Sequence, residues 1–203
     1  MSQLIENIIF DLGGVLYAVD YQRTRDYFAP YALYTQTAQS PVFDLFETGQ
    51  LSENEFTKRL QQEYNLPFSA DKIIDGWNAM LLGLIPERID IIKKLRQKYR
   101  LFLLSNTNEI HYRFIFEECN PLFNLFERCY FSHHLQLRKP NAEIFEYVLQ
   151  ENNLSRSNTL FIDDSPQHIE AARTLNLHTH FFQQESDFLA LMNQLNTAKN
   201  IVT

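Results

Sequence analysis

Short apolar runs of strand length alternate with longer stretches of helical periodicity over most of the chain. The apolar runs cover residues 5–10, 101–104, 129–131, 159–162 and 179–182. Because these runs are almost continuously apolar, we expect strands that are covered on both faces, as in a parallel sheet between helices. Helical periodicity is present at about residues 87–98, 108–118, 141–152, 166–175 and 186–196. This alternation predicts an α/β fold with right-handed crossovers.

The segment between the first two apolar runs has a different pattern. Its residues 22–29, 35–47, 53–64 and 70–82 have helical periodicity, and we expect no strand there. Ser52 and Glu55 have the spacing of a capping box, and Ser69 is placed to cap the helix that follows it. These features predict a helical unit inserted after the first strand. We therefore divide the chain into a core of residues 1–16 and 86–203 and a helical cap of residues 17–85.

Composition and charge exclude several classes of protein. A chain of 203 residues with 45% hydrophobic and 21% charged residues is globular, and it fits one domain with a modest insertion. The net charge of −7 argues against binding to nucleic acid or to an acidic membrane surface. No apolar run reaches the roughly 18 residues of a membrane span, and the first residues lack the pattern of a secretory signal. We expect a cytoplasmic monomer, with Cys119 and Cys129 as buried free thiols.

Polar residues follow four of the five predicted strands. They are Asp11, Gly13 and Gly14 after the first strand, Ser105 and Asn106 after the second, Arg138 and Lys139 after the third, and Asp163 and Asp164 after the fourth. Ligands of open α/β sheets bind at the carboxyl ends of the strands, so we expect these groups to converge. Crowded carboxylates need a cation between them, and oxygen ligands suit Mg²⁺. A carboxylate beside a lysine and a hydroxyl can accept a phosphoryl group.

Each of these residues taken alone also has a simpler interpretation. A lone Asp at a strand end is usually a turn or cap residue, and a lone Lys is usually a solvated charge. Their joint occurrence at four strand ends makes the simple interpretation much weaker. By contrast, His133 and His134 lack a third ligand at zinc spacing, and we expect neither to bind a metal. Trp77 is expected to pack in the core or the cap, and Tyr17 has both a site-facing and a surface interpretation.

The four polar groups resemble, in order, the four motifs of the haloacid dehalogenase-like (HAD) hydrolase superfamily. Residues 8–16 resemble the first motif, 103–106 the second, 138–140 the third and 161–164 the fourth. The resemblance spans residues 5–175 and implies a Rossmann-like parallel sheet. The helical insertion resembles a cap of the C1 type. The branch that the chain resembles is that of sugar-phosphate phosphatases of the alpha-D-glucose-1-phosphate phosphatase type.

The resemblance implies a role for each residue of the site. Asp11 would be the nucleophile that forms an aspartyl-phosphate. Mg²⁺ would be held by Asp11, the backbone carbonyl of Gly13 and Asp164, with Asp163 as a direct or an indirect ligand. Ser105 and Asn106 would bind the phosphoryl oxygens, and Lys139 would steady both Asp11 and the phosphate. The implied activity is Mg²⁺-dependent hydrolysis of a small phosphorylated metabolite, with a sugar phosphate as the expected substrate.

Two positions depart from the family pattern. Most phosphatases of the family have a general acid/base Asp two residues after the nucleophile, where this chain has Gly13. His168 stands where related sequences often have Asn or Asp in support of the metal site. Because of Gly13, two alternatives stay open. One is a metal-independent 2-haloacid dehalogenase, whose halide leaving group needs no acid. The other is a degenerate HAD protein that binds a ligand without turning it over.

Overall fold

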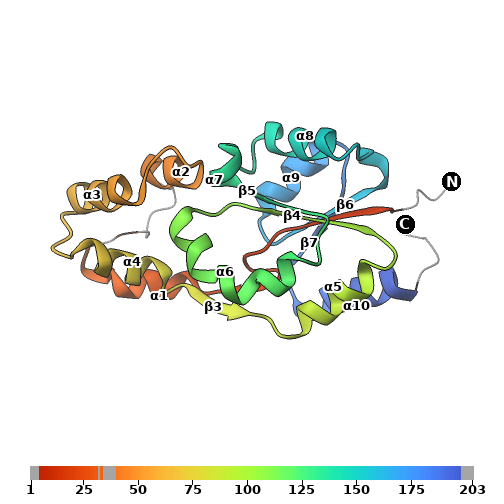
Figure 1. The fold of residues 1–203 in the computed structure, drawn as a ribbon, viewed down its shortest axis with the longest axis horizontal. Coiled ribbons are helices and arrows are strands. Elements are labelled where there is room, and N and C mark those ends of the chain that lie inside the picture. The colour runs from red at the N-terminus through yellow and green to blue at the C-terminus, as the bar shows by residue number, and fades with distance from the viewer. Residues whose placement is uncertain (1–4, 32, 34–39, 198–203) are drawn as a thin grey trace.

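The computed structural model describes residues 5–31, 33 and 40–197, and its centre is a five-stranded sheet (Figure 1). The strands are β1 (Asn7–Phe10), β4 (Arg100–Ser105), β5 (Arg128–Phe131), β6 (Thr159–Asp163) and β7 (His178–Phe181). They lie in the order β5-β4-β1-β6-β7, and every neighbouring pair is parallel. The five apolar runs of the sequence thus form the sheet, and the predicted α/β class with a Rossmann-like parallel sheet is confirmed.

The register of the sheet brings the strand ends together. Phe10 at the end of β1 pairs with Leu103 of β4 on one side and with Ile162 of β6 on the other. The backbone N–H of Asp11 donates to the carbonyl of Ile162 at 2.9 Å, which continues the ladder by one residue. The polar residues that follow these strands therefore leave the sheet at the same edge.

Helices cover both faces of the sheet. Helices α5 (Glu87–Leu95), α6 (Glu109–Phe123) and α10 (Glu185–Thr197) pack with Ile8, Phe10 and their neighbours on one face. Helices α8 (Ala142–Glu151) and α9 (Pro166–Thr174) pack with Ile9 and Phe161 on the other. Successive residues of β1 thus face opposite layers, and all four are buried. This burial is the physical reason for the continuously apolar strands.

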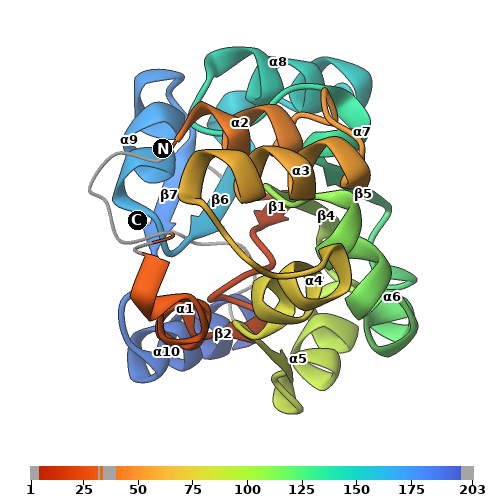
Figure 2. The same cartoon turned by 90° about the vertical axis from the view of Figure 1, so that its left-hand side faces the viewer.

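The inserted segment forms a helical unit with an apolar cluster of its own. Its helices are α1 (Tyr21–Tyr27), α2 (Pro41–Glu47), α3 (Glu53–Tyr64) and α4 (Ala70–Asn78). Short 3-10 turns occur at Ala29–Tyr31 here and at Arg156–Asn158 in the core. The cluster is rich in aromatic rings, among them Phe43, Phe56 and Trp77. The helices of the insertion lie at the end of the sheet toward which β1 points (Figure 2).

The helix caps of the insertion are those that the sequence predicts. In the capping box of α3, Ser52 N donates to Glu55 Oε2 at 2.8 Å, and Glu55 N donates to Ser52 Oγ at 3.3 Å. Ser69 Oγ accepts a hydrogen bond from Lys72 N at the start of α4. The predicted helix at residues 35–47 lies partly outside the described residues, and α2 covers its second half.

The prediction that the insertion contains no strand is wrong. Residues Tyr17–Val19 form β2 and residues Leu81–Leu84 form β3, and the two pair antiparallel. Helix α4 ends at Asn78, so the helix predicted for residues 70–82 is too long. The reason is tertiary: the segment 81–84 gains ladder hydrogen bonds from a strand far away in the sequence, and this overrides its helical pattern. The two connections between the insertion and the sheet thus form one ribbon.

Two further features complete the fold. A short helix, α7 (Ser132–Leu135), follows β5, and the sequence pattern does not predict it. Among the helices that the structure describes, none is both long enough and apolar enough to cross a lipid bilayer.

Candidate active site

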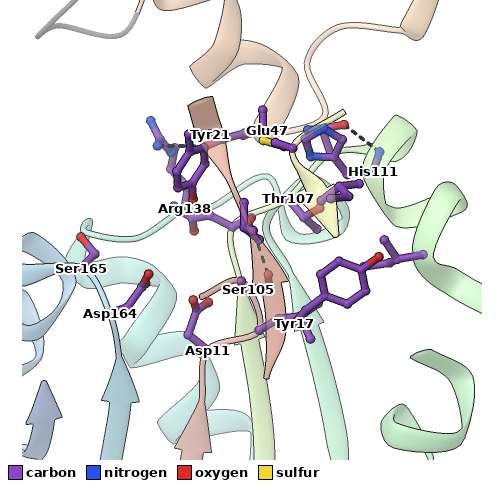
Figure 3. A pocket seen from close by; sticks show the side chains of 18 of the residues that line it. Asp11, Tyr17, Tyr21, Glu47, Ser105, Thr107, His111, Arg138, Asp164 and Ser165 are labelled. Atoms are coloured by element: carbon purple, nitrogen blue, oxygen red, sulfur yellow. Dashed lines mark hydrogen bonds and ion pairs between the residues drawn. The ribbon is translucent and has the colours of Figure 1, made fainter. Parts of the chain in front are cut away.

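A cavity of about 310 Å³ lies at the carboxyl edge of the sheet, beneath the inserted helices (Figure 3). Its walls include the residues singled out in the sequence, namely Asp11, Gly13, Ser105, Asn106, Arg138, Asp164 and His168. Lys139 and Asp163 are fully buried behind this wall. The structure therefore brings together all the candidate site residues of the four strand ends.

Lys139 joins two of the carboxylates. Its Nζ donates to Asp11 Oδ1 at 2.7 Å and to Asp163 Oδ2 at 2.6 Å. Burial alone would lower the pKa of Lys139, but the two carboxylates outweigh it and raise that pKa above the ordinary value. Lys139 therefore remains a cation in the interior, between Asp11, which follows β1, and Asp163, the last residue of β6.

One lysine does not balance three carboxylates. Oxygens of Asp11, Asp163 and Asp164 lie within 4.8 Å of one another. Burial, together with the charges of Asp163 and Asp164, raises the pKa of Asp11 to about 7 against the pull of Lys139. Burial and the neighbouring Asp163 likewise raise the pKa of Asp164 to about 6. This excess of negative charge, on oxygen ligands at the wall of a cavity, fits a divalent cation such as Mg²⁺.

Asp163 and Asp164 have different surroundings although they are adjacent. Asp163 accepts hydrogen bonds from Lys139 Nζ and from Ser165 N (2.8 Å), and His168 Nδ1 lies 3.0 Å from both of its oxygens. Burial works against ionisation of Asp163, but Lys139 and His168 outweigh it and bring its pKa to about 2. Asp164 instead lines the cavity. Asp164 is therefore the more open of the two carboxylates, and Asp163 is occupied with protein contacts.

Gly14 is required where Asp164 approaches the first loop. Its φ is +77°, and a Cβ there would lie 2.0 Å from Asp164 Oδ2. Any side chain at this position would displace the carboxylate and strain the backbone. The second glycine of the pair thus lets the ends of β1 and β6 come into contact.

Asn106 lines the cavity, and its side-chain amide bonds to protein backbone. Its Nδ2 donates to the carbonyl of Lys139 at 2.8 Å, and its Oδ1 accepts from Lys139 N at 2.9 Å. The side chain of Asn106 thus holds the backbone of Lys139, and its backbone N–H is the group left for a phosphoryl oxygen. Ser105 is buried and lines the cavity beside it, with only a long contact of 3.4 Å from its Oγ to the Asn106 carbonyl.

Several residues of the cavity wall carry no clear signal in the sequence. His111 Nε2 lies 3.1 Å from the carbonyl of Trp77, and the two rings stack at 5.1 Å between their centroids. Burial lowers the pKa of His111 to about 4, so this imidazole is neutral at physiological pH. Trp77 packs in the cap cluster as expected and also lines the cavity. The one sequence signal for His111 is its place three residues after Asn108, which caps the helix at the end of the loop after β4.

The insertion contributes charged residues to the same wall. Arg138 Nη2 lies 2.9 Å from Glu47 Oε2, and Arg138 also pairs with Asp44 of α2. This arginine of the third motif therefore links the sheet to the insertion. Tyr17 and Tyr21 also line the cavity, Tyr21 near Arg138 and Tyr17 near Ser105 (Figure 3). The site-facing interpretation of Tyr17 is thus the one that the structure supports.

The raised pKa of Asp11 gives a testable effect on the stability of the metal-free protein. Below about pH 4 this carboxyl group is protonated in both the folded and the unfolded state. Above that pH the unfolded state releases the proton, whereas the folded state keeps it until the pH rises through about 7. The free energy of unfolding therefore decreases over this pH range. We expect Asp11→Asn to raise the melting temperature in EDTA, relative to the wild type, by an amount that grows with pH. Thermal melts across this pH range measure it, and a difference that shrinks with pH would contradict the assignment.

Comparisons with known proteins agree with this geometry. A family model described as haloacid dehalogenase-like hydrolase matches residues 5–176. The chain is 29% identical over 194 residues to a D-ribitol-5-phosphate phosphatase of Bacteroides thetaiotaomicron, which covers 90% of this chain and 93% of that protein. It is 23% identical over 190 residues to a sesquiterpene phosphatase of Aspergillus oryzae, covering 87% and 89%. The crystal structure of a HAD family enzyme from Bacteroides thetaiotaomicron, in complex with magnesium and inorganic phosphate, superposes with a TM-score of 0.81 at 28% identity, covering 92% and 98%.

Proposed function

This chain belongs to the haloacid dehalogenase-like hydrolase family, and within that family we propose that it is a Mg²⁺-dependent phosphatase of a small phosphorylated metabolite. The observation that carries the proposal is the contact of buried Lys139 with Asp11 and Asp163, beside the open carboxylate of Asp164. Relatives named as phosphatases, and a similar structure in complex with magnesium and phosphate, support the same reaction.

The first chemical step is assigned to Asp11. Its carboxylate attacks phosphorus in line, the new O–P bond forms, and the bond from phosphorus to the leaving oxygen breaks. Lys139 neutralises charge on Asp11 and on the phosphoryl oxygens. The hydroxyl of Ser105 and the backbone N–H of Asn106 donate hydrogen bonds to those oxygens. Water then attacks the aspartyl-phosphate, which releases phosphate and restores the carboxylate.

The metal is assigned to the carboxylates at the cavity wall. Asp11, the backbone carbonyl of Gly13 and Asp164 would hold Mg²⁺, and Asp163 would support the site through Lys139 and His168. When bound, Mg²⁺ supplies positive charge that allows the phosphoryl group to approach Asp11. The raised pKa values of Asp11 and Asp164 indicate that the site lacks this charge without a cation.

We propose a sugar or polyol phosphate as the substrate. The cavity of about 310 Å³ is at the small end of ligand sites. Beyond the carboxylates, its wall contains the polar groups of Glu47, Arg138 and His111, which can hydrogen-bond hydroxyl groups. The ring of Trp77 can pack against the carbon skeleton. The relative that acts on D-ribitol 5-phosphate supports this class, whereas the sesquiterpene phosphatase makes a prenyl phosphate the competing class.

A substrate panel tests the proposal. Phosphate release is measured on sugar, polyol, prenyl and aryl phosphates, with Mg²⁺ and with EDTA, and halide release is measured on 2-haloacids. We expect Mg²⁺-dependent phosphate release that is fastest on one of the hydroxylated substrates. Preference for prenyl phosphates would change the substrate class but keep the reaction. Halide release without Mg²⁺, or Mg²⁺-dependent binding of phosphate without any turnover, would overturn the proposal that the protein is a phosphatase.

His168 gives a prediction on the affinity for Mg²⁺. Because His168 Nδ1 holds both oxygens of Asp163 at 3.0 Å, its loss should let the metal site relax. We expect His168→Ala to raise the Mg²⁺ concentration needed for half-maximal activity by about 10- to 100-fold. His168→Asn can still donate to the carboxylate and should lie close to the wild type. Equal Mg²⁺ requirements for His168→Ala and the wild type would show that this contact does not support the site.

A further inference from the structure

A second group of side chains of the types that ligate metals lies outside the active-site cavity. Glu109 is the first residue of α6, and His133 and His134 lie in α7. One ligand atom from each of the three residues lies within 4.8 Å of the others. His133 Nε2 is 3.5 Å from Glu109 Oε2, and the two imidazole rings are 4.0 Å apart between centroids.

His133 is buried without hydrogen-bond partners. Only 4% of its side chain is exposed, and within the described part of the chain neither ring nitrogen makes a hydrogen bond. A buried imidazole without a hydrogen bond lowers the stability of the folded protein, and buried polar groups normally have a hydrogen-bond partner. The ring of Tyr112 packs beside both histidines, with centroid distances of 5.4 and 5.1 Å, which restricts how they can turn. A ligand held by the imidazoles would complete this arrangement.

We propose that Glu109, His133 and His134 form a binding site for a transition-metal dication such as Zn²⁺, separate from the catalytic Mg²⁺. Neutral imidazoles with one carboxylate are ligands that Zn²⁺ prefers, whereas Mg²⁺ prefers an all-oxygen site. Three protein ligands leave the fourth position of a tetrahedral site for water. This proposal departs from the sequence-based expectation that neither histidine binds a metal, because the third side chain, Glu109, is distant from the two histidines along the chain.

The position of the site indicates what metal binding would do. Glu109 begins the helix that follows the loop of Ser105 and Asn106. Ser132, next to His133, accepts a hydrogen bond from Thr107 N and donates one to the Thr107 carbonyl, both at 2.9 Å. A metal held by Glu109 and the histidines would join the same two segments a second time. It would therefore stabilise the folded protein and hold the phosphate-binding loop in place.

Zinc binding to the untagged full chain tests the proposal. Calorimetric titration with Zn²⁺ is performed in excess Mg²⁺, which occupies the carboxylate site, and thermal melts are recorded in parallel. We expect one equivalent of Zn²⁺ to bind and to raise the melting temperature. His134→Gln and Glu109→Gln, both at exposed positions, should each weaken binding by about tenfold or more.

Two control variants make the outcome specific. His178→Gln removes an imidazole on β7, away from the site, and should leave Zn²⁺ binding unchanged. Asp164→Asn impairs the proposed Mg²⁺ site and should also leave it unchanged. Wild-type affinity in His134→Gln and Glu109→Gln, or absence of Zn²⁺ binding to the wild type, would overturn the proposal. Loss of binding in Asp164→Asn would place the zinc in the catalytic site instead. These readouts do not depend on the phosphatase activity.

Discussion

Phosphate release by Asp11→Asn should be lower than that of the wild type by a factor on the order of 10⁴ to 10⁶, the range seen when one member of a catalytic triad is removed. An amide has nearly the shape of the carboxylate, and its oxygen can still accept the hydrogen bond from Lys139 Nζ that Asp11 Oδ1 accepts at 2.7 Å. The cavity and the fold should therefore persist, while the group that attacks phosphorus is lost. Initial rates of phosphate release on the best substrate, with saturating Mg²⁺, measure the effect.

The matched control for this variant is Asp90→Asn. Asp90 lies on α5, and its side chain is 76% exposed in an ion pair with Lys93. This variant removes one carboxylate without touching the cavity, so its rate should equal that of the wild type.

A covalent readout separates the role of nucleophile from a role in metal binding alone. When the wild type is quenched during turnover, mass spectrometry should find a phosphoryl group on the peptide that contains Asp11. The peptide from Asp11→Asn should carry none. A phosphoryl group on another residue, or a variant that releases phosphate at the wild-type rate, would show that Asp11 is not the nucleophile.

The sheet could be predicted from the sequence because its strands carry a local signal. Residues 159–162 are Thr, Leu, Phe and Ile, and all four are buried, as in a strand that is covered on both faces. The β2–β3 ribbon carries no such signal. Tyr17 pairs with Leu84, and this pairing depends on how the chain enters and leaves the insertion. Residues 81 and 82 therefore follow a helical pattern in the sequence and belong to strand β3 in the structure.

In the candidate active site, too, some features have a local signal in the sequence and others depend on tertiary packing. The polar residues at strand ends are predictable because the end of a strand fixes where its next residue lies. The direction of a side chain within a loop is not fixed in this way, so the sequence does not show that the side-chain amide of Asn106 holds the backbone of Lys139. Glu47 comes from the insertion, and its position depends on how the helices pack above the sheet. Such contributions follow from tertiary packing and have no pattern along the chain.

Gly13→Asp should restore a proton donor for the leaving group. Gly13 stands where most phosphatases of the family have their general acid/base, and a carbonyl cannot transfer a proton. The position accepts a side chain: its φ lies outside the left-handed region, and a Cβ there would meet Val19 Cγ2 at 3.6 Å, an ordinary contact. The backbone carbonyl that we assign to Mg²⁺ is retained in the variant.

The expected gain from Gly13→Asp depends on the leaving group. Alkyl phosphates release a strongly basic alkoxide that needs a proton, so their turnover should rise by a factor of about 10² to 10⁴, the usual contribution of general acid–base catalysis. Aryl phosphates release a weakly basic phenoxide and should gain little. Gly13→Asn has nearly the same shape but no transferable proton, and it should leave both classes unchanged. The measurement is kcat on an alkyl and an aryl phosphate for the three proteins. If Gly13→Asp and Gly13→Asn change kcat equally, or if Gly13→Asp raises kcat equally on both substrates, proton transfer to the leaving group does not limit the rate of this enzyme.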